Sequence, residues 1–217
     1  MFLIFLKEDK MKTYIEILIL VFLSAVFLCG CGSGLNTVSI ESDKIVNLKN
    51  YSIHSPIGDD WEYQIDDEIQ SVMFYRQNDD VMKYVTGNSR NTFINIYRDQ
   101  TTIPTKNIDR QEFADGYMDS EFQIMLNNAN QNPYGAPILI ARDSVLNNEK
   151  LLYRMNYKFV RLPAQGHLYV YLPKSFEDDG IFYLFLIEEY GGDNILSSGY
   201  DFDQINNVLA TFNCIED

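Results

Sequence analysis

An apolar run near the start of the 217-residue chain decides how much of the sequence can belong to a folded domain. Between residues 17 and 28 only Ser24 is not apolar; lysines precede the run and small residues follow it. A basic start, an apolar centre of about 7–15 residues and a small-residue exit are typical of a secretory signal. The run is shorter than the ~20 apolar residues that a membrane span needs. We therefore expect residues 1–30 to be a signal peptide outside the fold, with translation beginning at either Met1 or Met11.

The end of this run, Leu28-Cys29-Gly30-Cys31, resembles the lipobox of bacterial lipoproteins, Leu-x-Gly/Ala-Cys. The resemblance implies that Cys31 receives a diacylglyceryl thioether and becomes the new N-terminus after cleavage. Two acyl chains hold a protein stably on a membrane, whereas one binds only marginally. We therefore expect membrane lipid as a partner through Cys31, and a location on the extracytoplasmic face of the cell membrane. The alternative is an ordinary secreted signal with a chance cysteine.

The rest of the chain is long enough for one domain. Setting aside residues 1–30 leaves 217 − 30 = 187 residues, which can build a single core. Residues 31–44, rich in Gly, Ser and Asn, are expected to form a flexible tether, and residues 45–217 a single globular domain. Only Cys214 remains beyond Cys31, so no disulfide framework can form within one chain.

The charge balance excludes one class of partner. The chain has a net charge of −14, and residues 1–30 contain three lysines against three acids, so the remainder keeps the whole −14. Such a surface repels nucleic-acid phosphates and an anionic leaflet. We expect no nucleic-acid partner, and we expect the lipid alone to provide the anchor.

Hydrophobic periodicity predicts strands, a helix, further strands and a last helix. Segments rich in β-branched and aromatic residues predict strands at residues 45–53, 72–75, 92–97, 138–146, 151–160, 167–172 and 181–187. A capping box at Asp109 and Glu112 opens an amphipathic helix that ends by Pro133, and a second helix begins at Asp201. This order predicts an α+β fold with a mostly antiparallel sheet of about six or seven strands and two main helices.

The segment from Tyr51 through Pro56 to Trp61, the apolar stripe of residues 202–212 and the hairpin at residues 147–150 resemble the PsbP-like family. This fold is shared by a photosystem accessory protein and the bacterial DcrB-type lipoproteins. The resemblance covers roughly Lys49 to Asn213. It implies an α/β/α sandwich that attaches to larger, often membrane-bound, assemblies, and it implies no catalytic set.

No catalytic, cofactor-binding or metal-ligating set emerges from the residues themselves. His54 lies near Asp59 and Asp60, but one histidine with scattered carboxylates has no known ligand spacing, so a solvated turn is the better interpretation. Acidic runs occur at residues 66–68, 177–179 and 188–189. A glycosidase needs only two carboxylates, placed about 5–9 Å apart. Abundance of acids alone does not predict such a pair.

The aromatic residues suggest a contact surface. Tyr169 and Tyr171 share a strand face with His167. If one face of the sheet is incompletely covered, these three residues form an exposed aromatic patch that favours protein or glycan contacts. The alternative is that both faces are covered and the tyrosines only point their hydroxyls outward.

We therefore expect a lipid-anchored, extracytoplasmic binding or accessory module, without enzymatic activity or cofactor, that attaches to a membrane or envelope protein. Two other functions stay open. A cell-envelope hydrolase would bring two carboxylates together in a cleft, with the pKa of one raised. A one-domain carrier would hold a small ligand in a deep apolar pocket between sheet and helix.

Overall fold

The computed structural model describes residues 38–40, 44–56, 61–76, 91–132, 134–161, 164–190 and 200–215. The chain divides into two compact units, Met1–Leu35 and Asn36–Asp217, and every element below belongs to the second. The expected signal peptide and Cys31 lie outside the described residues. Among the helices that the structure describes, none has the length and apolar character needed to cross a membrane.

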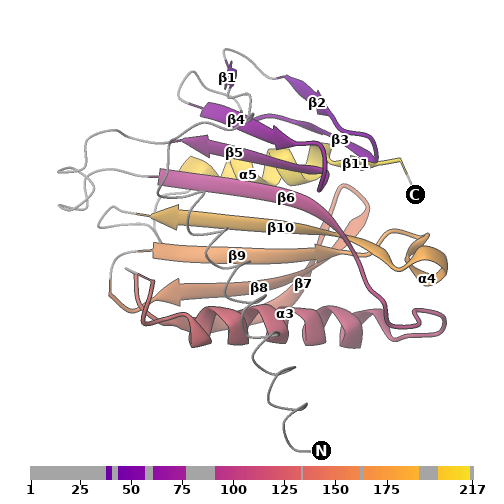
Figure 1. Ribbon diagram of the computed structural model, residues 1–217. Helices are drawn as coiled ribbons and strands as arrows, with labels where there is room; N and C mark the ends of the chain where they lie inside the picture. The colour runs from indigo at the N-terminus through magenta and orange to yellow at the C-terminus, as the bar shows by residue number, and fades with distance from the viewer. Residues whose placement is uncertain are drawn as a thin grey trace, which may run out of the picture. The chain divides into compact units, whose positions relative to one another are not determined.

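An antiparallel sheet forms the centre of the second unit (Figure 1). Its strands lie in the order β1-β4-β5-β6-β10-β9-β8-β7, so β6 and β10 are central and β7 is an edge strand. Every neighbouring pair is antiparallel. The bounds are β1 Val38–Ile40, β4 Trp61–Asp66, β5 Ser71–Arg76, β6 Asn91–Gln100, β7 Pro137–Asn147, β8 Lys150–Phe159, β9 Ala164–Tyr171 and β10 Ile181–Tyr190.

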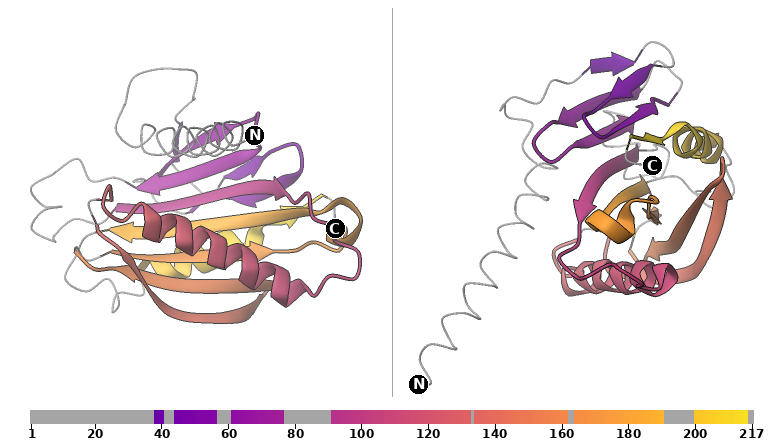
Figure 2. Two further views of the ribbon diagram at one scale, coloured as in Figure 1. Left: turned by 60° about the horizontal axis from the view of Figure 1, so that its bottom comes forward. Right: turned by 90° about the vertical axis from the view of Figure 1, so that its right-hand side faces the viewer.

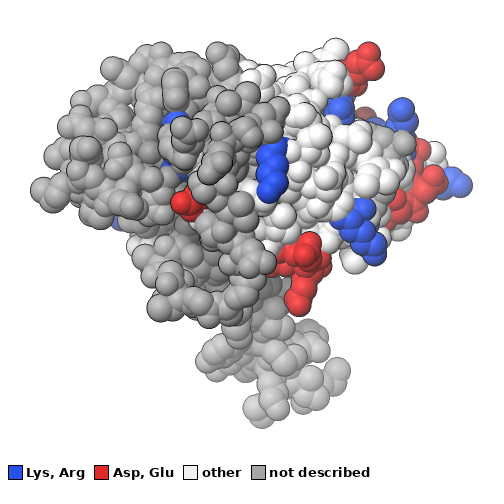
Figure 3. All heavy atoms as spheres, turned by 90° about the horizontal axis from the view of Figure 1, so that it is seen from above, with Lys and Arg blue, Asp and Glu red and all other residues white. Residues whose placement is uncertain are grey.

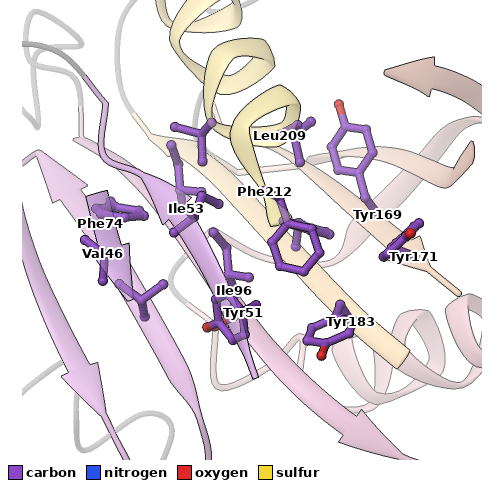
Figure 4. Packing of buried hydrophobic residues seen from close by; sticks show 14 of the residues in the cluster. Val46, Tyr51, Ile53, Phe74, Ile96, Tyr169, Tyr171, Tyr183, Leu209 and Phe212 are labelled. Atoms are coloured by element: carbon purple, nitrogen blue, oxygen red, sulfur yellow. The ribbon is translucent and has the colours of Figure 1, made fainter. Parts of the chain in front are cut away.

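A three-stranded sheet and a helix cover one face of this main sheet. The small sheet has the order β11-β3-β2, with β2 Ile45–Asn47, β3 Tyr51–His54 and β11 Asn213–Cys214. Helix α5, Tyr200–Thr211, leads directly to Phe212. The Phe212 ring lies 5.3 Å from the ring of Tyr51 and 5.0 Å from that of Tyr183, centre to centre (Figure 4). Phe212 therefore joins α5, the small sheet and the main sheet in one core.

Helix α3, Arg110–Asn127, covers the other face of the main sheet over β7, β8 and β9 (Figure 2). The predicted cap is present: Asp109 Oδ1 accepts a hydrogen bond from the Glu112 N–H at 2.9 Å. Ala114 and Met118, one turn apart, are fully buried against this face. A short helix, α4 Phe176–Asp179, connects β9 to β10 and ends at Gly180, whose φ is +70°.

The α+β class, the mostly antiparallel sheet and the two main helices are confirmed. Six of the predicted strands lie in the main sheet, which β4 and the three-residue β1 extend to eight strands, whereas the segment expected as a strand at residues 45–53 belongs to the small sheet. Helices α3 and α5 lie on opposite faces, as the α/β/α layering requires (Figure 2). Two details differ. The strand expected at residues 45–53 is split into β2 and β3, because the Leu48 N–H donates to the Tyr51 carbonyl and turns the chain, and β4 was not predicted.

Candidate functional site

The expected aromatic patch lies on the covered face of the sheet. His167, Tyr169 and Tyr171 do share one face of β9, but that face packs against the core beneath α5 (Figure 4). Tyr169 is 1% exposed and Tyr171 is 6% exposed. The Tyr171 ring lies 5.9 Å from that of Phe212. The prediction of an exposed contact patch is therefore wrong, because the segment that closes the domain covers these tyrosines.

His167 is a structural group in this covered face. Its Nδ1 lies 2.6 Å from Asn156 Oδ1. Burial, followed by the nearby charge of Arg154, lowers the pKa of His167 to about 4. Arg154 is itself bound by Asp143, with Nε 2.8 Å from Oδ1 and Nη2 2.5 Å from Oδ2. The imidazole is therefore neutral near pH 7 and its orientation is fixed by an amide.

The opposite face of β4, β5 and β6 is less covered. Helix α3 contacts β7, β8 and β9, and no described helix lies in front of β4 to β6 in Figure 1. We call the open face the partly exposed side chains that point to this side: Glu62, Gln64, Met73, Tyr75, Phe93, Asn95, Tyr97, Leu186 and Glu188. The alternate residues Val72, Phe74, Ile94 and Ile96 are all 0% exposed. Among the described strands, the open face is therefore the part of the sheet best placed to meet a ligand.

One row of side chains crosses the open face from β4 to β10. The register places Glu62 beside Tyr75, Tyr75 beside Phe93, and Phe93 beside Glu188. The Tyr75 hydroxyl donates to Glu62 Oε2 at 2.7 Å, and Gln64 Nε2 donates to the same hydroxyl at 3.4 Å. The row thus presents two aromatic rings between two carboxylates.

Because residue 166 on β9 is a glycine, a side chain on β8 can reach across it to Glu188 of this row on β10. Gly166 pairs with Glu188 on one side and with Tyr157 on the other. The buried Tyr157 ring lies over Gly166, where an added Cβ would overlap the ring. The Tyr157 hydroxyl thereby reaches Glu188 Oε1 and donates to it at 2.8 Å. Glycine in a strand often marks such a close approach, and here it lets β8 orient a carboxylate on β10.

Helix α3 adds a second pair of carboxylates at the rim of the open face. The Tyr117 hydroxyl donates to Asp99 Oδ2 at 3.2 Å, and Glu121 lies one turn further along the helix. Glu121 and Tyr97 also interact with the Tyr117 hydroxyl. Burial, followed by the charge of Asp99, raises the pKa of Glu121, and the Tyr117 hydroxyl opposes this shift. Burial also raises the pKa of Tyr117, which therefore stays protonated and able to donate.

The open face and its rim combine carboxylates with phenol and phenyl rings. Within the part of the chain that the structure describes, no three His, Cys, Asp or Glu side chains converge closely enough to hold a metal ion. Carboxylates form charge-assisted hydrogen bonds with ammonium and guanidinium groups, and aromatic rings attract the same cations. The arrangement is therefore suited to binding an organic cation.

The acidic runs singled out in the sequence serve other roles or diverge. Asp66 Oδ1 accepts from the backbone N–H groups of Glu68 and Ile69 in the turn after β4. Residues 177–179 lie in α4. Glu188 and Glu189 are neighbours in β10, so they point to opposite faces.

The pair that does meet at one hydroxyl, Asp99 and Glu121, was not predicted, because the two residues lie on different elements. The available signal was the alternation of Phe93, Asn95, Tyr97 and Asp99 along β6, which places all four on one face. The strand predicted at residues 92–97 ends two residues before Asp99, whereas β6 continues to Gln100.

The side of the domain seen in Figure 3 offers no comparable pattern. Its described surface is largely uncharged, and acidic and basic side chains lie intermixed on it, most of them toward one end. Charges of both signs in one place create no strong field of either sign. This side therefore gives no reason to prefer it over the open face.

Comparison with known proteins finds no family model and no curated protein that matches this sequence. The similar solved structures include the following two. The cyanobacterial PsbP (CyanoP) of Synechocystis has 14% sequence identity and a TM-score of 0.47, over 86% of this chain and 98% of that chain. LpqN, described as involved in cell envelope biogenesis of Mycobacterium tuberculosis, has 10% identity and a TM-score of 0.42, over 83% and 91%. Both TM-scores lie below 0.5 and both identities below 25%, so neither likeness assigns a function.

Proposed function

We propose that this chain is a lipid-anchored, extracytoplasmic binding module that holds a basic segment of a membrane or envelope protein and catalyses no reaction. The observation that carries the proposal is the open face. Its side chains are partly exposed, whereas the alternate residues of the same strands are buried. A sheet face with partly exposed aromatic side chains is the kind of surface that a protein partner covers.

Charge selects the chemistry of the partner. The open face and its rim carry the carboxylates of Glu62, Glu188, Asp99 and Glu121. On the described strands β4, β5, β6 and β10, no Lys or Arg points to this side, because Arg76 and Arg98 alternate onto the other one. The whole chain carries a net charge of −14, which attracts a basic partner over a longer range.

Binding is tested with the full-length chain in detergent micelles and a fluorescent peptide of alternating lysine and threonine. Removing two open-face charges by Glu62→Gln with Glu188→Gln is expected to weaken binding about 10-fold, since close charge pairs couple by more than about 1 kcal/mol. The matched control, Glu149→Gln with Glu177→Gln, removes two exposed charges from a turn and from α4 and should leave most of the affinity. Equal losses in both variants would contradict the proposal, since net charge alone would then explain binding.

The anchor is proposed from Leu28 to Cys31 and is tested separately. Cys31→Ala is expected to abolish labelling of the protein by radioactive fatty acid and to leave the signal uncleaved. Cys29→Ala is the matched control, because it changes a cysteine two residues away that the lipobox does not require. Normal labelling of Cys31→Ala would disprove the anchor and leave the binding proposal standing.

A cell-envelope hydrolase is the second candidate, and one observation favours it. Asp99 and Glu121 meet at Tyr117, and the pKa of Glu121 is raised, as a general acid requires. The test is release of soluble fragments from purified cell-wall glycan. Release that Glu121→Gln abolishes, and that Glu112→Gln on the exposed side of the same helix preserves, would replace the binding proposal.

A further inference from the structure

The edge strand β7 is a second surface, and on one side it pairs with no other described strand. It is an 11-residue strand at the end of the eight-stranded sheet, and within the described chain it pairs only with β8. In an antiparallel ladder, alternate N–H and C=O groups of an edge strand point away from the sheet. This row can form hydrogen bonds with one further strand.

The first half of β7 is exposed and apolar. Three consecutive large side chains are open to solvent: Ile138 at 45%, Leu139 at 41% and Ile140 at 51%. Val160, at the end of the neighbouring strand, is 54% exposed. Natural edge strands are usually protected by charged side chains or proline, and an exposed apolar edge is a template for pairing.

A β-bulge between Leu139 and Ala141 bends this edge and interrupts its register. Bulges limit long, continuous pairing between sheets. The bulge therefore favours a short added segment over the full-length pairing of two β7 strands. Two copies of the chain, each carrying −14, also repel one another.

The surroundings of this end of β7 are positively charged, whereas the chain as a whole has a net charge of −14. The segments 134–141 and 156–161 contain Lys158 and Arg161 and no acid. Residues 123–132, which form the end of α3 and the turn after it, contain no charge. Lys158 lies directly across from Ile138, and both basic residues are exposed. A carboxylate on an added strand would meet these two cations.

We propose that β7 binds an extended segment of another protein as an added antiparallel strand, with apolar side chains over Ile138 to Ile140 and a carboxylate next to Lys158 and Arg161. Main-chain hydrogen bonds supply affinity in this mode, and side-chain contacts supply selectivity. Every pair in the main sheet is antiparallel, so the acidic end of the added segment is its C-terminal end. This surface is separate from the open face and requires a partner segment of opposite charge.

The test uses the full-length chain in detergent micelles and two synthetic peptides. The first contains three Thr-Val repeats followed by two glutamates, and the second ends in two lysines instead. Hydrogen–deuterium exchange and a fluorescence titration report where and how tightly each binds. The proposal predicts slower exchange in β7 with the acidic peptide, and weaker binding by about 10-fold for the lysine peptide.

Two sets of variants decide the outcome. Ile138→Glu should abolish protection of β7, whereas Ile103→Glu, at a somewhat more exposed apolar position (59%) between β6 and α3, should leave it. Lys158→Glu with Arg161→Glu should reverse the preference between the two peptides.

Other outcomes overturn the proposal. Binding without slower exchange in β7, no binding by either peptide, or an unchanged preference after the charge reversal would each disprove it. A doubled mass that Ile138→Glu abolishes would instead assign the edge to a second copy of this chain.

Discussion

The two faces of strands β4 to β6 are built from alternate residues of the same segments, yet they differ in cover. Phe74 and Ile94 are fully buried, whereas Tyr75 and Phe93, one residue away, are partly exposed. The buried face lies under α5 and the small sheet, both contributed by the ends of the domain. The other face has less helix cover, because α3 packs mainly over β7, β8 and β9 and reaches β6 through Tyr117.

The docking of α3 therefore decides where the open face lies. At its start, the Arg110 guanidinium donates to the carbonyls of Leu172 and Pro173, which follow β9. Further along, Asp119 pairs with Arg142 of β7. These contacts place the helix mainly over β7 to β9, and through Tyr117 it reaches Asp99 at the end of β6, so that β4 and β5 have the least helix cover. The position of one helix thus determines which part of a sheet face stays partly exposed.

The largest expected effect separates the two faces directly. Phe74→Ala empties a fully buried site and should reduce the free energy of unfolding by about 3–5 kcal/mol. Phe93→Ala, on the neighbouring strand but on the open face, should cost about 1–2 kcal/mol, because its ring is already partly in water. Urea denaturation of both variants measures the difference. Equal losses would mean that the open face is as well covered as the other.

The covered face should also make stability depend on acid. The pKa of His167 falls from its usual 6.5 to about 4, so between these values the unfolded chain binds a proton that the folded chain does not. Stability therefore rises with pH across this window, and is lost on acidification by up to about 3 kcal/mol. Urea titrations at pH 7, 5.5 and 4.5 should show a steeper loss for the natural chain than for His167→Gln. Parallel curves would disprove the burial of a neutral histidine.

Gly166 links the covered half of the sheet to the open face, and a side chain there should disturb both. Gly166→Ala would push a methyl group into the buried Tyr157 ring, at an expected cost of about 1–3 kcal/mol in unfolding free energy. It should also weaken binding of the lysine–threonine peptide, because Glu188 loses its hydrogen bond from Tyr157. Gly116→Ala in α3 is the control: nothing lies within 4 Å of its added Cβ, and alanine favours the helix by about 1 kcal/mol.

The smallest expected effect lies at the rim and has the opposite sign to that of His167. Since the pKa of Glu121 is raised in the folded state, its contribution to stability is full below about pH 4.5, its usual pKa, and is lost as the pH rises through the folded value. Glu121→Gln should therefore be slightly more stable than the natural chain at pH 7, with no such gain at pH 4. A destabilised variant at pH 7 would show that the ionised carboxylate is needed by the fold.

The features that could be predicted from the sequence are those that depend on local residue patterns. The alternation through Tyr153, Met155 and Tyr157 identified a buried face of β8, and Asp109 with Glu112 marked the start of α3. Both signals depend on residues within a few positions of one another, so no knowledge of the remaining fold is needed.

The part of the site that the sequence did not predict depends on register and docking. Tyr169 and Tyr171 were placed on the correct common face, but the cover over that face comes from residues more than thirty positions away, such as Leu209 and Phe212. The role of Gly166 depends on the register of β8, β9 and β10, which places it between Tyr157 and Glu188. Nothing in the residues around Gly166 indicates that alignment.

The small sheet has a consequence for the order of assembly. Strand β3 pairs with β11, and the His54 N–H donates to Thr211 Oγ1 across a sequence separation of 157 residues. Contacts this distant form late, because the loop between them must close first. If the chain is exported as proposed above, its first residues emerge first, and β3 has no β11 to pair with until the last helix has followed. The small sheet and α5 would then cover the main sheet only after the whole chain has emerged.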